Sequence, residues 1–402
     1  MAVQLIAVTR AVASVVTVAA LLAPTYALAD DVFKVGFIAP LSGSFAALGD
    51  SIDRGARLYE KVHGNTISPG VTIQVIRRDD AGVPDNTRRI AQELIVRDNI
   101  KVITGIALSP QGFALSKIAT EAKIPVALMN ATTSSLTRSS PYFVRFSYTQ
   151  WQTAYPMGVW AAKHGVKVAA SLVADYAAGV DSEAAFKKGF EDNGGKVVGA
   201  DRAPMVTTDY LPFMERIKAE KPEAVFVFVN NGRMPAVAKA FNDAGLKAAG
   251  VKLIGPGDNA LDDELQTMPA EVEGLITAAT YAASNPGQGN VDFVKAWKNE
   301  YGENSLPNVT AVSGWDAMSA IYAAAKELGP GADGAAILKS LANWKGTSSP
   351  RGDASVDPQT RDIVLPIKMN KVEIVNGKPT NVTFEEEPPT KDPWKTFNPE
   401  QK

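Results

Sequence analysis

Small hydroxyl-bearing and amide-bearing residues dominate the segments that follow the predicted strands. In KVITGIALSPQGFALSKIA, residues 101–119, a buried strand runs into a polar loop and a helix begins near Ser109. A helix N-terminus offers unpaired N–H groups and a partial positive charge, which favours an anion. The Ser109 hydroxyl and the amides near Gln111 and Gly112 are therefore predicted to hold an anionic group. A helix N-cap is the simpler role for Ser109, and the two roles are compatible.

The chain has almost none of the groups that acid–base, thiol or metal chemistry requires. It contains no cysteine and two histidines, His63 and His164, each of which precedes a glycine at the end of a predicted helix. Histidine in the last helical turn usually caps a carbonyl or complements the helix dipole. We therefore expect no catalytic residue, no metal ligand and no cofactor.

The first 29 residues have the pattern of an export signal. Arg10 is the only charged side chain before Asp30, residues 11–23 are apolar, and Ala27-Leu28-Ala29 matches a small-residue cleavage site. The apolar stretch is too short to span a bilayer comfortably. We predict a signal peptide at 1–29 and a periplasmic mature protein, with an uncleaved N-terminal anchor as the alternative.

Length and charge bound the class of protein further. A chain of 402 residues is long enough for two domains. The formal net charge is −2, with 41 basic and 43 acidic residues. Because such a chain lacks a broad basic field, it is a poor partner for nucleic acid or for an anionic membrane surface. We expect neither as a partner.

Strand and helix patterns alternate from residue 32 onward. Runs of β-branched apolar residues are followed, after short loops, by stretches with helical spacing, up to the strand in PYFVRF. The alternation restarts with a helix at 151–165 and continues to a strand at 251–258. Such repetition predicts parallel sheets covered by helices on both faces. The predicted fold class is therefore α/β, with two units of similar length.

The C-terminal part of the chain breaks this rhythm. Three helical stretches, at 290–301, 310–328 and 334–344, are followed by extended segments. The last segment, 386–402, is rich in proline and charge. Such a composition buries little apolar surface, so we expect an exposed tail.

In open parallel sheets, ligands bind beyond the carboxyl ends of the strands. The segment NATTSS follows the fourth strand, and ADYAAG, NNGR and GPGDNA follow strands of the second unit. Thr132 and Thr133 are candidate hydroxyl donors beside Ser109, although threonine is also common in plain loops. The adjacent carboxylates Asp79-Asp80 and Asp262-Asp263 are interpreted as solvated surface, because the side chains of sequence neighbours diverge.

An ordered set of segments carries a family resemblance. FKVGFIAPLSGSFAALGDSIDRGARL, RRDDAG, VITGIALSPQG, IPVALMNATTSSLT and VKLIGPGD resemble the branched-chain amino acid type binding proteins of ABC importers, over nearly all of 32–330. The resemblance implies a two-lobed type I periplasmic-binding-protein fold, in which each lobe is a parallel sheet flanked by helices. Three hinge crossovers would join the lobes, near Phe146, Ala279 and Val364.

The crossovers divide the chain into lobes of two pieces each, and a ligand is expected between the lobes. The predicted pieces are 30–147 plus 280–362 for lobe 1 and 148–279 plus 363–385 for lobe 2, followed by the tail at 386–402.

The resemblance also assigns binding roles by position. The family's contacts with the ligand carboxylate fall on Ser109, next to Leu108, and on Ala131, Thr132 and Thr133. The strand-end reasoning also selects Ser109, Thr132 and Thr133.

Other positions depart from the family pattern. Leu48 stands where the family often has a pocket aromatic, Tyr176 lies near the lid tyrosine, and Asn230 stands where a tyrosine is common. The acidic residue that holds the substrate's amino group is replaced by Gly257, with Asp258 next to it. A buried ammonium without an anionic partner is costly. Either Asp258 therefore reaches into the site or the ligand has no amino group.

The segment SPRGDASVDPQTRDIV resembles a branch of the family that includes binders of aromatic and other organic acids. We therefore expect a small carboxylate ligand with an apolar body, with an organic acid ahead of a branched-chain amino acid. The predicted protein is a monomer that delivers this ligand to an ABC permease and converts nothing. A ligand-sensing receptor domain and an α/β enzyme are the alternatives. Trp151, Trp160 and Trp315 either line the cleft or pack in the core, which is the more frequent role.

Overall fold

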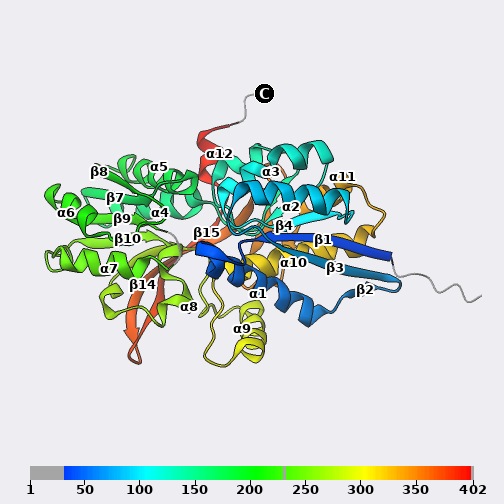
Figure 1. Cartoon of the computed structure of the whole chain (residues 1–402). Helices are drawn as coiled ribbons and strands as arrows, with labels where there is room; N and C mark the ends of the chain where they lie inside the picture. Colours follow the sequence, from blue (N-terminus) through cyan, green and yellow to red (C-terminus); the bar gives the residue numbers. More distant parts are fainter. Residues whose placement is uncertain (1–30, 230–231, 400–402) are drawn as a thin grey trace, which may run out of the picture.

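The computed structural model describes residues 31–229 and 232–399. The predicted signal peptide at 1–29 and the predicted site residue Asn230 lie outside the described residues. Two sheets lie side by side, each with helices packed on it (Figure 1). None of the helices in the described ranges combines the length and the apolar character that a membrane crossing needs.

The first sheet has six strands in the order β2-β3-β1-β4-β5-β6. Neighbouring strands from β3 to β6 are parallel, whereas β2 pairs with β3 antiparallel. The strands are β1 (Asp31–Ala39), β2 (Thr66–Ser68), β3 (Val71–Asp79), β4 (Val102–Gly105), β5 (Val126–Leu128) and β6 (Phe143–Arg145). Phe37 and Ile38 of β1, whose side chains point to opposite faces, are both fully buried, as expected for a strand covered on both faces.

Helices cover both faces of this sheet. One hydrophobic core includes residues of α1 (Ala46–His63), α9 (Gln288–Tyr301), α10 (Val309–Leu328) and α11 (Gly334–Ala342). A second core includes residues of α2 (Pro84–Val96) and α3 (Ser109–Ala122). Helices from the C-terminal part of the chain therefore complete the half that the N-terminal part begins.

The second sheet follows the order β12-β13-β14-β11-β10-β9-β7-β8, with β15 paired to β14. Its strands are β7 (Val168–Ala174), β8 (Lys196–Ala203), β9 (Ala224–Phe228), β10 (Lys252–Pro256), β11 (Ile276–Ala279), β12 (Lys345–Gly346), β13 (Ala354–Val356), β14 (Ile363–Val375) and β15 (Lys378–Thr390). One core packs α4 (Gln150–Lys163) and α5 (Ala177–Glu191) on it, and another packs α6 (Leu211–Ala219) and α7 (Met234–Asp243).

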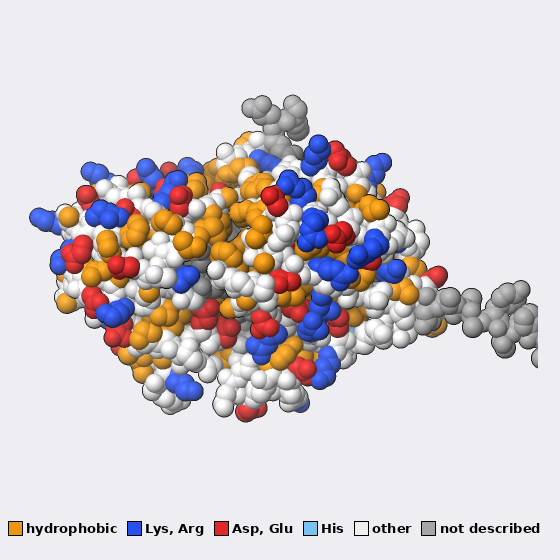
Figure 2. Space-filling view, in the orientation of Figure 1, with side chains coloured by type: hydrophobic (Ala, Val, Ile, Leu, Met, Phe, Trp, Pro, Cys, Tyr) orange, Lys and Arg blue, Asp and Glu red, His pale blue; other side chains and the backbone are white. Residues whose placement is uncertain are grey.

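The predicted alternation of strands and helices is confirmed, and so is the interpretation of both histidines. His63 is the last residue of α1, and its Nδ1 lies 3.0 Å from the Tyr59 carbonyl oxygen. His164 follows α4, and its Nδ1 lies 2.9 Å from the Trp160 carbonyl oxygen. Both rings therefore contact a carbonyl group in the last turn of a helix, as predicted. Figure 2 shows basic and acidic side chains interspersed over the visible face of the molecule.

The chain passes between the two halves three times, at 146–149, 280–287 and 357–362. Strand β14 follows the third passage and serves both halves. Its Ile363 and Leu365, like Val356 of β13, belong to a core of the first sheet, whereas its Ile367 and Met369 belong to a core of the second sheet. The number of passages agrees with the three hinge crossovers that the resemblance implies. The division of the chain into lobes at particular residues stays a prediction.

The expectation of an exposed tail at 386–402 is wrong for 392–395. Asp392 caps the short helix α12 (Pro393–Phe397), and Asp392 and Lys395 are only 1% and 8% exposed. Burial of Lys395 is possible because its Nζ lies 3.3 Å from Oδ2 of Asp362, a carboxylate of the third passage. The composition of the segment gives no sign of this distant partner.

Helix α12 contacts both halves of the molecule and lies between them in Figure 1. Its Phe397 ring lies 5.3 Å from the Tyr155 ring of α4, on the second sheet. Lys395 Nζ donates at 2.7 Å to Oγ1 of Thr137, which belongs to the short helix η2 (Ser134–Arg138) of the first half. The C-terminal helix is thus a fourth link between the halves.

Candidate ligand-binding site

The turn after β4 positions the start of α3 at the carboxyl edge of the first sheet. Gly105 has φ of +92° and Ile106 has φ of +54°, a left-handed conformation that is costly for a β-branched residue. Leu108 is the N-cap of α3, and its N–H donates to Gln111 Oε1 at 2.8 Å. Ser109 is therefore the first residue of the helix, and the expectation that it is the N-cap is wrong.

Ser109 and Thr133 form a buried hydroxyl pair beside the N-terminus of α3. Thr133 Oγ1 lies 2.8 Å from Ser109 Oγ, and the Thr133 N–H donates to the same oxygen at 3.3 Å. Ala131, which precedes them at the end of β5, has φ of +56°. Ser109, Ala131, Thr132 and Thr133 are all buried. The structure thus brings the predicted carboxylate contacts together at the ends of β4 and β5.

Asp80 is fully buried, so the interpretation of Asp79-Asp80 as solvated surface is wrong for Asp80. Thr87 Oγ1 donates to Asp80 Oδ2 at 2.6 Å, and the Gly82 N–H donates to Oδ1 at 3.0 Å. Gln111 Nε2 also donates to Oδ2. Burial raises the pKa of the Asp80 carboxyl. This carboxyl ties α2 to α3 and so fixes the helix start that carries Ser109.

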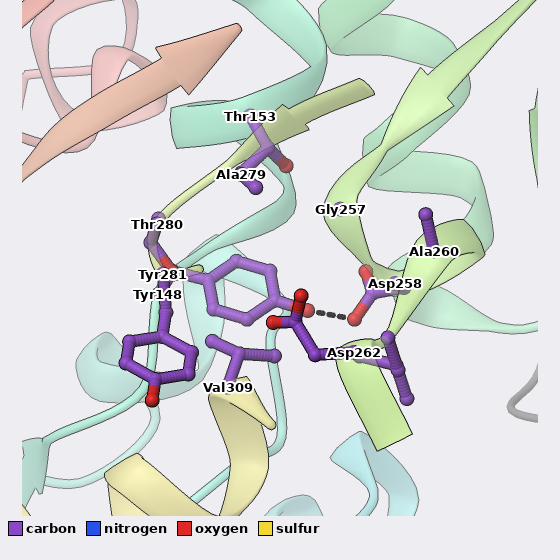
Figure 3. A pocket seen from close by; sticks show the side chains of 11 residues that line it. Tyr148, Thr153, Gly257, Asp258, Ala260, Asp262, Ala279, Thr280, Tyr281 and Val309 are labelled. Atoms are coloured by element: carbon purple, nitrogen blue, oxygen red, sulfur yellow. Dashed lines mark hydrogen bonds between the residues drawn. The ribbon is translucent and has the colours of Figure 1, made fainter. Parts of the chain in front are cut away.

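A small pocket lies where the second sheet meets the first half (Figure 3). It is lined by Tyr148, Thr153, Gly257, Asp258, Ala260, Leu261, Asp262, Ala279, Thr280, Tyr281 and Val309. Its volume is about 10 Å³, room for about one water molecule. An apolar cavity that binds benzene has a volume of about 150 Å³. A ring-sized ligand therefore enters only if the walls of the pocket move apart.

The Asp258 carboxyl connects this pocket to the hydroxyl groups of the first sheet. Tyr148 Oη donates to Asp258 Oδ1 (Figure 3), and Gln150 Nε2 donates to Oδ2 at 3.0 Å. Gln150 Nε2 also donates to Thr132 Oγ1 at 3.2 Å. Burial, together with repulsion from Glu264, raises the pKa of Asp258 to about 7.

Gly257, the predicted position of the family's acidic residue, has no room for a side chain. A Cβ at Gly257 would lie 2.6 Å from the Cβ and 2.9 Å from the Cα of Ala279. Such contacts are closer than packed atoms tolerate, so a larger residue requires β10 and β11 to separate. Gly257 therefore offers only its backbone, and Asp258 and Asp262 are the residues that bring carboxyl groups to the pocket.

Two contacts join the halves around the pocket. The Ser134 N–H of η2 donates to Asp181 Oδ2 of α5 at 2.7 Å. Asn308 Nδ2, at the start of α10, lies 2.9 Å from both carboxylate oxygens of Asp263 in α8 (Asp262–Leu265). Burial raises the pKa of Asp181 to about 6 and that of Asp262 to about 6. The interpretation of Asp262-Asp263 as solvated surface is therefore wrong.

Some predicted site residues lie elsewhere. Leu48 on α1 and Leu108 belong to a hydrophobic core of the first sheet. Tyr176 is the N-cap of α5, and its ring lies 6.0 Å from that of Phe228. Of the predicted site residues in the described ranges, Gly257 and Asp258 line the pocket. Leu48, Leu108 and Tyr176 do not, and neither do Ser109, Ala131, Thr132 and Thr133. Their roles as ligand contacts stay predictions.

The three tryptophans left open by the sequence pack in cores. Trp151 and Trp160 are buried on the second sheet. The Trp315 ring lies 4.9 Å from the Tyr59 ring and 5.0 Å from the Phe293 ring, against the core of the first sheet. All three therefore pack in a core, which is the more frequent role, and do not line the pocket.

Sequence reasoning missed Tyr148, Gln150 and Thr280. All three lie within a few residues of the predicted crossovers near Phe146 and Ala279. A segment that passes between two lobes borders the space between them. Residues just after a predicted crossover are therefore candidate ligand contacts. Their position next to a predicted crossover is the sequence signal that could have identified them.

The raised pKa of Asp258 predicts a pH-dependent contribution to stability. Between pH of about 4 and about 7 the folded protein keeps a proton on Asp258 that the unfolded chain releases, so this stabilisation is lost as pH rises through about 7. Relative to the variant Asp258→Asn, the free energy of unfolding of the wild-type protein should fall by about 1–3 kcal/mol from pH 5 to pH 8. Urea unfolding of both proteins without ligand measures the difference. A difference that does not change with pH contradicts the prediction.

Two parallel-sheet units, three connections and a pocket between the units define a two-lobed binding protein. Residues 32–378 match the periplasmic binding protein family. The chain belongs to this family, whose members are solute-binding proteins of transporters, and the resemblance seen in the sequence is confirmed.

Relatives and solved structures agree with this assignment. The chain is 36% identical over 344 residues to Leu/Ile/Val-binding protein homolog 6 of Brucella abortus (strain 2308), which covers 85% of this chain and 88% of that protein. It is 44% identical to a solute-binding protein of an ABC transporter from Rhodopseudomonas palustris BisB5 in complex with 3,4-dihydroxybenzoic acid, with a TM-score of 0.86 and coverage of 91% and 99%. A similar protein from Rhodopseudomonas palustris HaA2, in complex with p-hydroxybenzoic acid, is 34% identical, with a TM-score of 0.85 and coverage of 90% and 98%.

Proposed function

We propose that the protein captures a small aromatic carboxylate, with a hydroxylated benzoate as the first candidate, between two lobes. It then delivers this ligand unchanged to the permease of an ABC importer. In this proposal the mature protein acts as a monomer in the periplasm, after removal of residues 1–29. The observation that carries the choice of ligand is the pairing of a crowded Gly257 with an Asp258 carboxyl that already holds two donors.

The carboxylate end of the ligand is assigned to the first sheet. Ser109, Thr132 and Thr133 supply hydroxyl groups at one point, and α3 begins there. A helix N-terminus and hydroxyl donors together stabilise an anion without a buried cation. No redox or acid–base step is part of this arrangement, because a binding protein needs only to hold and release.

The other end of the ligand is assigned to Asp258. A carboxyl with a pKa of about 7 is partly protonated near neutral pH and is then a weak partner for an ammonium group. A phenol hydroxyl donates to a carboxylate and accepts from a carboxylic acid, so it fits both protonation states. This favours a hydroxylated aromatic acid over an amino acid. The ligands of the two Rhodopseudomonas proteins, 3,4-dihydroxybenzoic and p-hydroxybenzoic acid, support the same class.

Calorimetric titration of the mature protein tests this proposal, after unfolding and refolding to remove any bound ligand. We expect 4-hydroxybenzoate and 3,4-dihydroxybenzoate to bind with Kd near 1 μM, about −8 kcal/mol, and leucine to bind at least about 100-fold more weakly. Tight binding of leucine without binding of either aromatic acid contradicts the proposal and favours the branched-chain amino acid alternative.

Delivery to a permease is separable from ligand binding. The alternative partner is a signalling protein, with the chain acting as a ligand-sensing domain. An uptake assay with the radiolabelled acid discriminates the two, because loss of the gene abolishes uptake in the first case. In the second case uptake persists and the transcriptional response to the acid is lost.

A further inference from the structure

Helix α12 is attached to the second half of the molecule. It follows β15 of the second sheet, and Trp394 packs against the core that includes α4 and α5. The Phe397 ring lies 5.9 Å from the Trp151 ring and 5.3 Å from the Tyr155 ring, both of α4. Lys188 Nζ of α5 lies 4.6 Å from the centre of the Phe397 ring, a cation–π contact. The helix is therefore expected to move with the second sheet.

Helix α12 also contacts η2, which packs against a core of the first sheet. Arg138 of η2 donates from Nη2 to the carbonyl oxygen of Asn398, directly after α12. Its guanidinium carbon lies 4.6 Å from the centre of the Trp394 ring. The hydrogen bond from Lys395 Nζ to Thr137 Oγ1, described above, joins the same two elements. The C-terminal helix therefore bridges the two halves at η2 (Figure 1).

Helix η2 lies directly after the predicted carboxylate contacts Ala131, Thr132 and Thr133. The Ser134 N–H of η2 donates to Asp181 Oδ2 of α5, so η2 faces the second half there as well. The pocket between the halves has room for about one water molecule, and a larger ligand enters only when the walls move apart. Movement of η2 away from α5 breaks the Ser134–Asp181 hydrogen bond, and the contacts of α12 with η2 oppose this movement.

We infer that α12 is a clasp between the halves, which holds η2 close to α4 and α5 and so limits how often the site opens. Its contacts form when η2 and the second half are close, so they favour the closed arrangement over the open one. Weakening the attachment of α12 at either end should therefore increase the fraction of open molecules. The inference goes beyond the proposed function, because the clasp acts on the entry and release of any ligand.

Amide hydrogen exchange of Ser134, followed by NMR on the mature protein after removal of any ligand, tests the clasp. Ser134 is buried, and the acceptor of its N–H lies on the other half, so this N–H exchanges when the halves separate. Phe397→Ala removes the ring contacts with α4 and the contact with Lys188, and should raise the exchange rate of Ser134 about fivefold or more. Arg138→Gln removes the cation that lies over Trp394 and should act in the same direction.

Phe384→Ala is the matched control. Phe384 of β15 is 47% exposed, against 40% for Phe397, and its ring also lies 5.9 Å from a tryptophan ring of α4, that of Trp160. Both partners belong to the second half, so this variant should destabilise the protein without opening the site. We expect it to change Ser134 exchange less than about twofold. It should raise the exchange rate of the N–H of Ile103, a buried residue of β4 that reports global unfolding.

Two results would overturn the inference. The first is a Ser134 exchange rate that Phe397→Ala leaves unchanged, or that Phe384→Ala raises equally, because equal acceleration indicates general destabilisation. The second is wild-type exchange of Ser134 that is no faster than that of Ile103, because the halves then separate only when the whole protein unfolds.

If the protein binds 4-hydroxybenzoate as proposed, release of this ligand provides a second readout. Its dissociation rate in stopped-flow measurements should rise about fivefold or more in Phe397→Ala and less than about twofold in Phe384→Ala. Equal dissociation rates in the two variants contradict the clasp. Absence of binding rejects the proposed ligand, and the exchange measurement, which is made without ligand, still decides on the clasp.

Discussion

The double variant Ser109→Ala/Thr132→Val is expected to bind 4-hydroxybenzoate at least about 100-fold more weakly than the wild-type protein. Both hydroxyls lie at the strand ends where α3 begins, and both are buried. A hydrogen bond to a charged group contributes about 1.5–3 kcal/mol, so two of them contribute about 3 kcal/mol or more. That amount corresponds to a factor of more than about 100 in Kd. Calorimetry measures the Kd of each protein.

The matched control lies near the other end of the same helix. Thr120 Oγ1 donates to Ser140 Oγ at 2.8 Å, which makes a second hydroxyl pair far from the N-terminus of α3. Thr120→Val/Ser140→Ala should change the Kd by less than about threefold while costing about 1 kcal/mol of stability. If Ser109→Ala/Thr132→Val leaves the affinity for every acidic ligand unchanged, the assignment of the carboxylate end is wrong.

Asp362→Asn is expected to lower the free energy of unfolding by about 3 kcal/mol or more, the largest effect on stability that we predict for one substitution. Asp362 is buried at the third passage, with its Oδ1 3.4 Å from Arg145 Nη1 and its Oδ2 3.3 Å from Lys395 Nζ. Removing this carboxylate takes away an acid that both buried cations share, and leaves Asp392 near both of them and Asp181 near Arg145. Urea unfolding at pH 7 measures the loss.

Two comparisons separate this explanation from a general effect of substitution. Asp192→Asn removes an exposed ion pair with Lys188 on α5, 2.9 Å long, and should cost less than about 0.5 kcal/mol. Adding Lys395→Met to Asp362→Asn removes one of the uncompensated cations and should restore part of the loss, a coupling that a double-mutant cycle measures. If Asp362→Asn and Asp192→Asn have the same urea midpoint of unfolding, the buried Asp362 carboxylate does not stabilise the protein as we propose.

Much of the architecture followed from local pattern. The helix predicted at 151–165 is Gln150–Lys163, and the strand predicted at 251–258 is Lys252–Pro256. Periodicity and glycine stops decide such elements locally, so no knowledge of the partner element is needed. The prediction of an exposed C-terminal tail was wrong in part for the opposite reason. Lys395 is buried because Asp362 neutralises it, and composition carries no information about that pairing.

The candidate site was predictable where a general rule applies. Strand ends selected Ser109 and Thr132, because ligands of parallel sheets bind there, and the family resemblance selected Asp258. Tyr148 and Gln150 follow an edge strand at a crossover, where the angle between the halves decides which side chains face the pocket. The burial of Asp80 could not be predicted from local sequence either, because it depends on contacts with Thr87 and Gln111 from two different helices.

The placement of β14 has a consequence for the order in which the protein is completed. This strand occupies an interior position between β13 and β11, yet it is the second-last strand to be synthesised. Until it arrives, β11 exposes an unpaired edge. Such long-range pairing is slow to form. Because β14 pairs with β11 and lies near the C-terminus, it postpones the final collapse until almost the whole chain has been synthesised.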